Sequence, residues 1–337
     1  MLKISTIIPC YNEERYIASC LDSILGSDID FSSYEVILID GDSSDKTVKI
    51  IQEYQKKYDF IKLLHNPKKI VPISMNLGIK EAKGDYIVRL DAHASYPKNY
   101  FSKLLEYLIK LKADNVGSVI KTEVKNKNKK SNSIKEVLSH PLGVGNSDFR
   151  TGTKEIKEVD TVPFGFYRKE VFQKYGLYNE KLIRNQDIEL NKRIKKGGGK
   201  IYLIPDVTCT YYARENFKDL AKNNFANGKW NILTAYYTKT LSSLSLRHFV
   251  PLIFVFSLMV PLAISLFFKK TIMLTTISLL VYLFFVTIVA LTLRSKETSF
   301  FYLVASFLTL HLSYGIGSLA GIWDVFINLI GLQKSNR

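Results

Sequence analysis

The chain has 337 residues, 47% of them hydrophobic, and carries 47 basic against 31 acidic residues, a formal net charge of +16 at pH 7. This length is enough for a sizeable core, and three cysteines without a C-x-x-C pair exclude a disulfide framework, so a reducing compartment is expected. The positive charge suits anionic lipid headgroups or phosphorylated substrates. Nucleic acid is not an expected partner, because the densest basic run, 121–130, lacks interleaved aromatic residues and is typical of a solvated loop.

The first 120 residues alternate between strand-like and helix-like patterns. Short apolar runs predict strands at residues 4–9, 34–39, 61–64, 86–90 and 115–120. The segments between them predict helices at residues 15–25, 45–58, 72–82 and 97–111. Strands that alternate with helices at this spacing predict an α/β fold, with an open, mainly parallel sheet covered by helices on both faces.

Polar loops follow the first two predicted strands. Tyr11 and Glu13 come after the first, and Asp40 and Asp42 after the second. Ligands usually bind at the carboxyl ends of strands in such sheets, so these loops predict a pocket for a base or ribose, with Asp40 accepting a hydrogen bond from a base N–H. Acidic residues that simply form turns are the alternative. Neither a dinucleotide fingerprint nor a P-loop is present.

The fourth predicted strand ends in a carboxylate and an imidazole, Asp91 and His93. Side chains alternate along an extended chain, so both can point the same way just beyond the strand. An oxygen beside a neutral imidazole nitrogen suits a divalent ion such as Mn²⁺. A helix N-cap aspartate and an exposed histidine before Pro97 are the alternative.

Residues 122–160 interrupt this alternation and are polar and glycine-containing, so they predict an inserted flexible loop or lid. Helical stretches and a strand at 200–203 follow, and then an amphipathic helix at 217–228. The aromatic residues of 230–246 fit either the membrane interface or ordinary packing.

Three long apolar stretches close the chain, at 249–268, 271–293 and 300–330. Each exceeds the roughly 18 residues that mark a candidate membrane span, so about three transmembrane helices are expected within 249–331. The third stretch contains His311, which is either a functional residue of the membrane or part of tight helix packing. The flanking charges give little information on orientation. No signal peptide is recognisable, so the preceding domain is expected in the cytoplasm.

Several motifs occur in the order and spacing of family 2 glycosyltransferases, which the chain resembles. They are PCYNE at 9–13, IDGDSSD at 39–45, LDAH at 90–93, VPFGFYR at 162–168 and RNQDIEL at 184–190. The run DAHA, the segments 143–145 and 149–150, and HLSYGIG at 311–317 are similar to the succinoglycan-type exopolysaccharide branch. The resemblance implies a GT-A nucleotide-sugar-binding fold.

The resemblance also implies roles for individual residues. The donor-binding positions would be Pro9, Tyr11, Glu13, Asp40, Asp42 and Asp91. Asp91 and His93 would hold a metal where the family has D-x-D, and Asp187 would be the general base, with Gly165 and Gln186 on the acceptor side. Two departures stand out: His93 replaces the usual second aspartate and Gln186 the usual glutamate. A carboxylate at a helix N-terminus is the alternative for Asp187.

These observations lead to a hypothesis for the whole chain. It is expected to be an inverting, Mn²⁺- or Mg²⁺-dependent hexosyl-type transferase of the cell membrane, active in surface or exopolysaccharide biosynthesis. It would move one sugar from a nucleotide-diphosphate sugar to a polyprenyl-diphosphate-linked saccharide. Transfer of a single sugar is expected because the Q-x-x-R-W sequence of processive synthases is missing near Trp230. A non-catalytic, membrane-anchored nucleotide-sugar-binding protein is the alternative.

The predicted organisation has four parts. Residues 1–120 would form the nucleotide-sugar-binding half of the catalytic domain and residues 121–228 its acceptor-side half. Interfacial helices at 229–248 and the transmembrane helices would follow.

Overall fold

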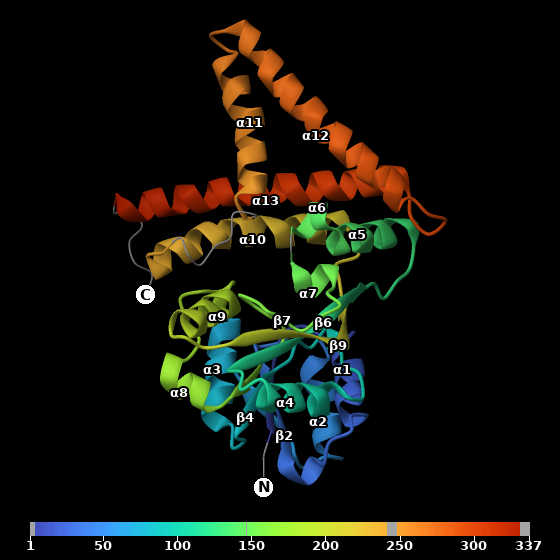
Figure 1. The fold of residues 1–337 in the computed structure, drawn as a ribbon, viewed down its shortest axis with the longest axis vertical. Coiled ribbons are helices and arrows are strands. Elements are labelled where there is room, and N and C mark those ends of the chain that lie inside the picture. The colour runs from blue at the N-terminus through green and yellow to red at the C-terminus, as the bar shows by residue number, and fades with distance from the viewer. Residues whose placement is uncertain (1–3, 146, 241–247, 331–337) are drawn as a thin grey trace. The chain divides into compact units, whose positions relative to one another are not determined.

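The computed structural model describes residues 4–145, 147–240 and 248–330. By compactness the chain divides into two units (Figure 1). The first unit consists of residues 1–121 and 148–212, and the second of residues 122–147 and 213–337. Of the insertion predicted at 122–160, the part up to residue 147 therefore belongs with the C-terminal helices, and the rest belongs to the first unit. The expected division of the catalytic domain into a nucleotide-sugar-binding half and an acceptor-side half depends on where ligands bind, so it stays a prediction.

The first unit is built on a sheet with the strand order β3-β2-β1-β4-β8-β6-β9-β5, with β7 beside β9. The strands are β1 (Ile4–Cys10), β2 (Tyr34–Asp40), β3 (Ile61–His65), β4 (Tyr86–Arg89), β5 (Ala94–Ser95), β6 (Asn115–Glu123), β7 (Lys157–Glu158), β8 (Phe166–Arg168) and β9 (Ile201–Tyr212). The pairs among β1 to β4 are parallel, whereas β8 pairs antiparallel with β4 and β6. The predicted parallel sheet is confirmed, and antiparallel strands extend it.

Two apolar layers cover the sheet, because side chains alternate between its faces. Ile8 and Leu38 face one layer, and Ile7 and Ile37 face the other. Helices supply the rest of each layer, as expected for a sheet with parallel strands. They are α1 (Ile17–Leu25), α2 (Thr47–Gln55), α3 (Val71–Glu81), α4 (Tyr100–Lys110), α8 (Glu170–Tyr175) and α9 (Gln186–Lys196), with the short η1 (Phe31–Ser33) and α7 (Asp148–Thr151). The predicted α/β fold is thus confirmed.

The second unit is helical. It comprises α5 (Lys129–Ser139), α6 (Pro141–Val144), α10 (Phe217–Thr238), α11 (Val250–Ile264), η4 (Lys269–Thr271), α12 (Ile272–Leu293) and α13 (Phe300–Leu329). The prediction of a loop over 122–160 is wrong for α5. Asn128 caps this helix together with Ser131, and Val137 packs in a cluster with Phe307 of α13. The apolar residue Phe307, against which α5 packs, lies some 170 residues away in the sequence. The segment 129–139 is polar, and nothing near it in the sequence indicates this partner, so a loop was predicted.

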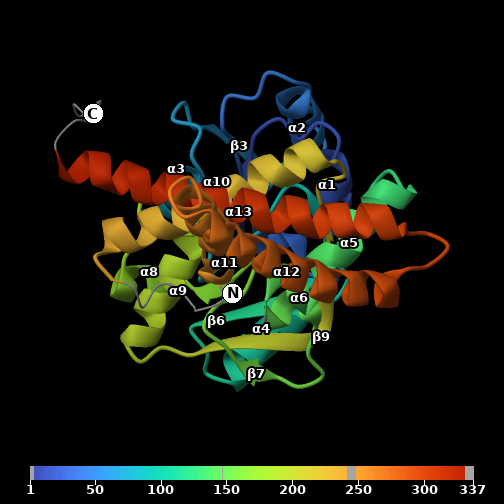
Figure 2. The same ribbon diagram turned by 90° about the horizontal axis from the view of Figure 1, so that it is seen from above.

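Two long helices of the second unit, α10 and α13, pack against each other (Figure 1), and Figure 2 shows that they cross. Glycines allow this approach: a Cβ on Gly228 would strike the carbonyl of Tyr314, and one on Gly317 that of Phe225. An ion pair of 2.7 Å between Lys229 and Asp324 also joins the helices. The aromatic segment 230–238 is part of α10, while residues 241–247 of the predicted interfacial region lie outside the described residues.

The three predicted apolar stretches are helical. Residues 269–293 and 300–329 form helices long and apolar enough to cross a membrane, whereas α11 has only 15 residues. Helices α11 and α12 form a hairpin (Figure 1). It exposes large apolar side chains, and Leu266 and Phe267, in the connection between its helices, are 83% and 84% exposed. Exposed apolar surface of this extent marks a binding or membrane surface. The expected apolar C-terminal helices are confirmed, with two candidate spans where about three were expected.

Candidate active site

The candidate site lies where β1, β2 and β4 end. Cys10 pairs with Asp40, and Ile7 with Arg89, so the three strands release their loops at one edge of the sheet. The loops after β1 and β2 are joined by hydrogen bonds. The Glu13 amide donates to the Thr47 hydroxyl over 2.7 Å, and the Asn12 amide donates to the Ser43 hydroxyl over 2.9 Å. Their backbone is therefore fixed by contacts that do not involve a ligand.

Asp40 is 4% exposed and has one oxygen without a partner among the described residues. Its Oδ2 accepts a hydrogen bond of 3.0 Å from the Ser43 amide, whereas Oδ1 is the unpaired atom. A buried acceptor without a donor is destabilising by about 1–3 kcal/mol. A ligand that brings an N–H to Oδ1 would remove this cost.

Three residues on the exposed side of these loops lie together. Asp42 has a left-handed φ of 66° and forms an ion pair of 2.7 Å with Lys69. The Lys69 ammonium lies 5.9 Å from the centre of the exposed Tyr11 ring. Pro9, inside β1, is half-buried. Two of the predicted donor-binding residues, Tyr11 and Asp42, thus lie next to the same ammonium group, that of Lys69.

The imidazole of His93 contacts Glu13. The distance from His93 Nδ1 to Glu13 Oε1 is 3.0 Å, and the ring of Tyr211 packs edge-on against His93 at 5.0 Å between centres. Burial opposes a charge on this imidazole, but Tyr211, the hydrogen bond to Glu13 and the charge of Asp91 together raise the pKa of His93 to about 10. Without a metal, His93 is therefore charged at neutral pH.

These residues fit a divalent ion in one specific way. Histidines that bind metals usually donate the second ring N–H to a carboxylate, which orients the ring and fixes its tautomer. Glu13 contacts Nδ1 in this manner and leaves Nε2 as the atom that could coordinate a metal. The described residues contain no group of three or more His, Cys, Asp or Glu side chains suited to a metal. A metal at Asp91 and His93 would thus require further ligands, such as diphosphate oxygens and water.

Arg89 connects the donor side of the site to its acceptor side. Its guanidinium lies 3.4 Å from Asp91 Oδ1 and 3.2 Å from Asp187 Oδ2. Burial opposes the charge, but Asp91 and Asp187 outweigh it and raise the pKa of Arg89 above its usual value. Arg89 Nε is buried and unpaired among the described residues. Arg89 was not predicted as a site residue, although its charge within the apolar run YIVRL is a usable indication.

Asp187 lies in the first turn of α9, as the alternative interpretation expected. Its Oδ1 accepts a hydrogen bond of 2.9 Å from the Ile188 amide, while Oδ2 faces Arg89. The preceding residue, Gln186, is buried, and its amide oxygen has no partner among the described residues. The two interpretations of Asp187 are therefore compatible, because this residue lies at the N-terminus of a helix and also in the candidate site.

Gly165 lies beside this cluster, and its carbonyl accepts a hydrogen bond of 3.0 Å from the Arg89 amide. A Cβ at this position would overlap the Tyr167 ring. A second missed residue is Arg150, whose guanidinium lies 5.3 Å from the centre of the Tyr211 ring. Arg150 thus brings a positive charge to the aromatic ring that contacts His93.

A sheet with parallel strands that carries carboxylates where these strands end is typical of an α/β ligand-binding domain. Comparison with known proteins agrees with this class. Residues 5–176 match the family model "Glycosyl transferase family 2". The chain belongs to this family.

Two relatives extend beyond the matched segment. A dolichyl N-acetyl-alpha-D-glucosaminyl phosphate 3-beta-D-2,3-diacetamido-2,3-dideoxy-beta-D-glucuronosyltransferase of Methanococcus voltae is 33% identical over 67% of this chain and 71% of its own length. The succinoglycan biosynthesis protein ExoA of Rhizobium meliloti is 29% identical over 66% of this chain and 67% of its own. The resemblance to the succinoglycan-type branch is thus confirmed.

Solved structures share the fold. A Pyrobaculum calidifontis mannosyltransferase in complex with GDP-Man and Mn²⁺ has a TM-score of 0.60 at 14% identity, over 96% of this chain and 87% of that one. S. aureus TarS in complex with UDP-GlcNAc has a TM-score of 0.53 at 17% identity, over 99% and 93%. At these identities the likeness shows the GT-A fold alone.

Proposed function

We propose that this family 2 glycosyltransferase moves one sugar from a nucleotide-diphosphate sugar to a lipid-linked saccharide, with inversion at the anomeric carbon. The observation that carries the proposal is the guanidinium of Arg89, which contacts both Asp91 and Asp187. It supports a common reaction centre, because a group bound at Asp91 and a hydroxyl bound at Asp187 would lie on either side of one cation.

The donor would bind at the ends of β1 and β2. Asp40 Oδ1 would accept the N–H of the base, which is supported by its burial without a partner among the described residues. Pro9 and Glu13 would line the nucleoside pocket, and Tyr11 and Asp42 its exposed side. Relatives of the same fold are known with GDP-Man and UDP-GlcNAc, which supports a nucleotide-diphosphate sugar as donor.

Asp91 and His93 would hold a divalent metal, Mn²⁺ or Mg²⁺, with Glu13 orienting the imidazole. When bound, the metal would supply positive charge to the leaving diphosphate. The Mn²⁺ complex of the Pyrobaculum calidifontis enzyme supports a metal of this kind. Arg150 would add a second positive charge near Tyr211.

Asp187 would act as the general base. In the displacement, the acceptor hydroxyl oxygen bonds to the anomeric carbon as the bond from that carbon to the diphosphate oxygen breaks. The hydroxyl proton passes to the Asp187 carboxylate, and the bonding electrons leave with the nucleoside diphosphate. A single displacement inverts the anomeric configuration. Gly165 and Gln186 would lie along the acceptor.

The acceptor would be a polyprenyl-diphosphate-linked saccharide for surface or exopolysaccharide. The Methanococcus voltae relative is named for a dolichyl phosphate-linked sugar, and the Rhizobium meliloti relative for succinoglycan biosynthesis. The exposed apolar hairpin of α11 and α12 supports a place at the cell membrane. We further propose that the catalytic unit faces the cytoplasm, where nucleotide sugars are made.

The test is Asp187→Asn, which removes the base and keeps the size of the side chain. Transfer of labelled sugar to lipid should fall at least about 100-fold, while the affinity for donor, measured by calorimetry with Mn²⁺, should change little. Asp59→Asn, an exposed carboxylate between α2 and β3, is the matched control and should keep full activity. Retained turnover in Asp187→Asn would overturn the base assignment. A wild-type chain that binds donor but never releases nucleoside diphosphate would instead be a binding protein.

A further inference from the structure

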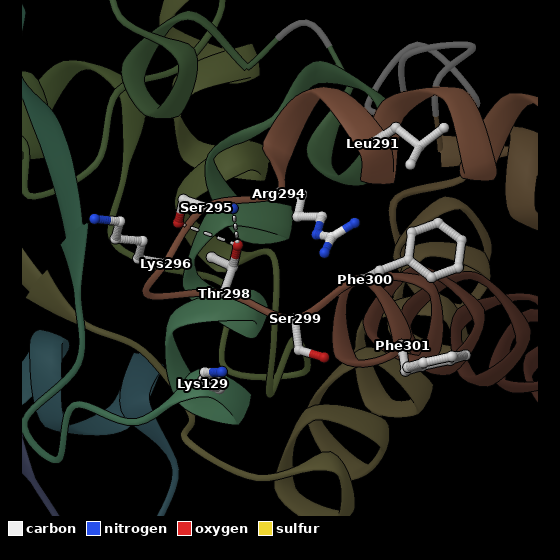
Figure 3. A pocket seen from close by; sticks show the side chains of 9 residues that line it. All are labelled: Lys129, Leu291, Arg294, Ser295, Lys296, Thr298, Ser299, Phe300 and Phe301. Atoms are coloured by element: carbon white, nitrogen blue, oxygen red, sulfur yellow. Dashed lines mark hydrogen bonds between the residues drawn. The ribbon is translucent and has the colours of Figure 1, made fainter.

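A cavity of about 770 Å³ lies in the second unit, where α12 ends and α13 begins (Figure 3). Three basic side chains line it: Lys129 from α5, and Arg294 and Lys296 from the turn between α12 and α13. Leu291, Phe300 and Phe301 also line it; Figure 3 shows the Arg294 guanidinium on their side, whereas Lys129 and Lys296 lie on the other side. The cavity thus combines three basic side chains, its cationic wall, with three apolar side chains, its apolar wall.

The basic side chains of the cationic wall form no ion pair within the described residues. No acidic side chain lines the cavity, although Glu297 belongs to the same turn. Unpaired basic side chains along one cavity attract an anion. Hydroxyl groups of the lining, such as that of Ser299, add hydrogen-bond donors that suit phosphate oxygens.

The backbone of the turn is held by its own hydrogen bonds. The Ser295 amide donates to the Thr298 hydroxyl over 2.8 Å, and that hydroxyl donates to the Leu293 carbonyl over 3.1 Å. Helix α5 also holds this turn, because the Ser299 amide donates a hydrogen bond of 3.1 Å to the Ser133 hydroxyl of α5. The basic groups of α5 and of the turn therefore project from one connected framework.

The apolar wall continues the surface of the apolar helices. Leu291 belongs to the last turn of α12, which is long and apolar enough to cross a membrane. Phe301, in the first turn of α13, is 79% exposed. Basic residues directly after an apolar span lie at the level of the lipid headgroups, where hydrocarbon gives way to charge. Free phosphate would use only the cationic wall of such a cavity.

We infer that this cavity binds an anionic phospholipid of the bilayer. The phosphate would lie among Lys129, Arg294 and Lys296, and the acyl chains would follow Phe300 and Phe301. This lipid would hold α5 and the α12–α13 turn together at the membrane surface. The inference is independent of sugar transfer, because it rests on residues outside the candidate active site.

The experiment uses the full chain in lipid nanodiscs, with a single tryptophan at the apolar wall. Phe301→Trp is combined with Trp230→Phe and Trp323→Phe, which remove the two native tryptophans. Brominated phosphatidylglycerol should quench this fluorescence at a lower mole fraction than brominated phosphatidylcholine. Arg294→Gln with Lys296→Gln should lower that preference by about fivefold for each charge removed. Lys269→Gln with Lys270→Gln, at the other end of α12, is the matched control and should leave it unchanged.

Three outcomes would overturn the inference. Equal quenching by the two lipids would show no headgroup preference. Recovery of fluorescence with millimolar inorganic phosphate would indicate a site for free anions, and recovery with a few mole per cent of polyprenyl phosphate would assign the cavity to the acceptor lipid. As a check without aromatic substitutions, native mass spectrometry of the detergent-extracted wild-type chain should show retained phosphatidylglycerol. The Arg294→Gln, Lys296→Gln pair should lose it.

Discussion

In the first unit, apolar side chains fill two layers around the sheet, whereas in the second unit many of them cover the outside of the helices. Ile7 and Ile8 are fully buried, while Phe267 and Phe284 are exposed. Large apolar side chains thus take opposite positions in the two units. Burial in a core suits a domain surrounded by water, and hydrocarbon is the surrounding that matches the α11–α12 hairpin.

The largest expected effect comes from replacing a buried isoleucine of the first unit by asparagine, compared with the same replacement at an exposed isoleucine of the second unit. Ile37→Asn puts an amide into a fully buried layer and should destabilise the first unit by more than about 4 kcal/mol, measured by urea denaturation. Ile277→Asn alters an exposed position of α12 and should leave that denaturation unchanged. It should instead reduce the fraction of chain that resists extraction from membranes at high pH. Similar urea midpoints for both variants would contradict the comparison.

The next largest effect concerns the buried guanidinium of Arg89 in the first unit. Arg89→Gln leaves the carboxylates of Asp91 and Asp187 without their shared cation. We expect transfer to fall by two to three orders of magnitude, or about 3–4 kcal/mol. Arg89→Lys keeps the charge but cannot contact both carboxylates equally and should recover part of the rate. Single-turnover kinetics at saturating donor separates this loss from weaker binding; an unchanged rate in Arg89→Gln would exclude a role in the reaction.

A smaller effect tests the packing of the second unit. Gly317→Leu forces α13 away from the Phe225 carbonyl of α10 and should destabilise the helix pair by about 1–3 kcal/mol. The neighbouring Ile316→Leu, at an exposed position, keeps the volume and is the control. Thermal unfolding in nanodiscs should show a lower midpoint for Gly317→Leu only. Equal midpoints would mean that the close approach of the two helices adds no stability.

The last effect is confined to a pH range and concerns the metal-free chain. Binding of a proton by His93 favours folding, because its pKa is raised from about 6.5 in the unfolded chain to about 10 in the folded one. This stabilisation is complete below pH 6.5 and is lost as the pH rises through about 10. The stability difference between wild type and His93→Gln should therefore shrink over this range in EDTA. A constant difference would contradict the charged imidazole.

The sequence was sufficient for the parallel strands β1 to β4, because each of them carries its own pattern, but not for the short strands β5, β7 and β8. The strand predicted at 34–39 is found at Tyr34–Asp40, since a run buried on both faces needs no partner to be recognised. The helix α5 was not predicted, because its burial depends on Phe307. In the candidate site, too, contacts between residues distant in the sequence could not be predicted. Asp91 and His93 follow one strand and were paired from spacing, whereas the contact of Arg89 with Asp187 joins residues nearly a hundred positions apart.

The packing of α5 against α13 sets an order of events during synthesis. At roughly 5–20 residues per second, the ribosome needs on the order of ten to thirty seconds to proceed from Val137 to Phe307. All residues of the first unit have been made by residue 212, so its sheet can form within this interval. The apolar face of α5 waits until the C-terminal helices emerge. A chaperone or the membrane surface would have to protect this helix during the delay, and truncation before α13 should leave it sensitive to proteases.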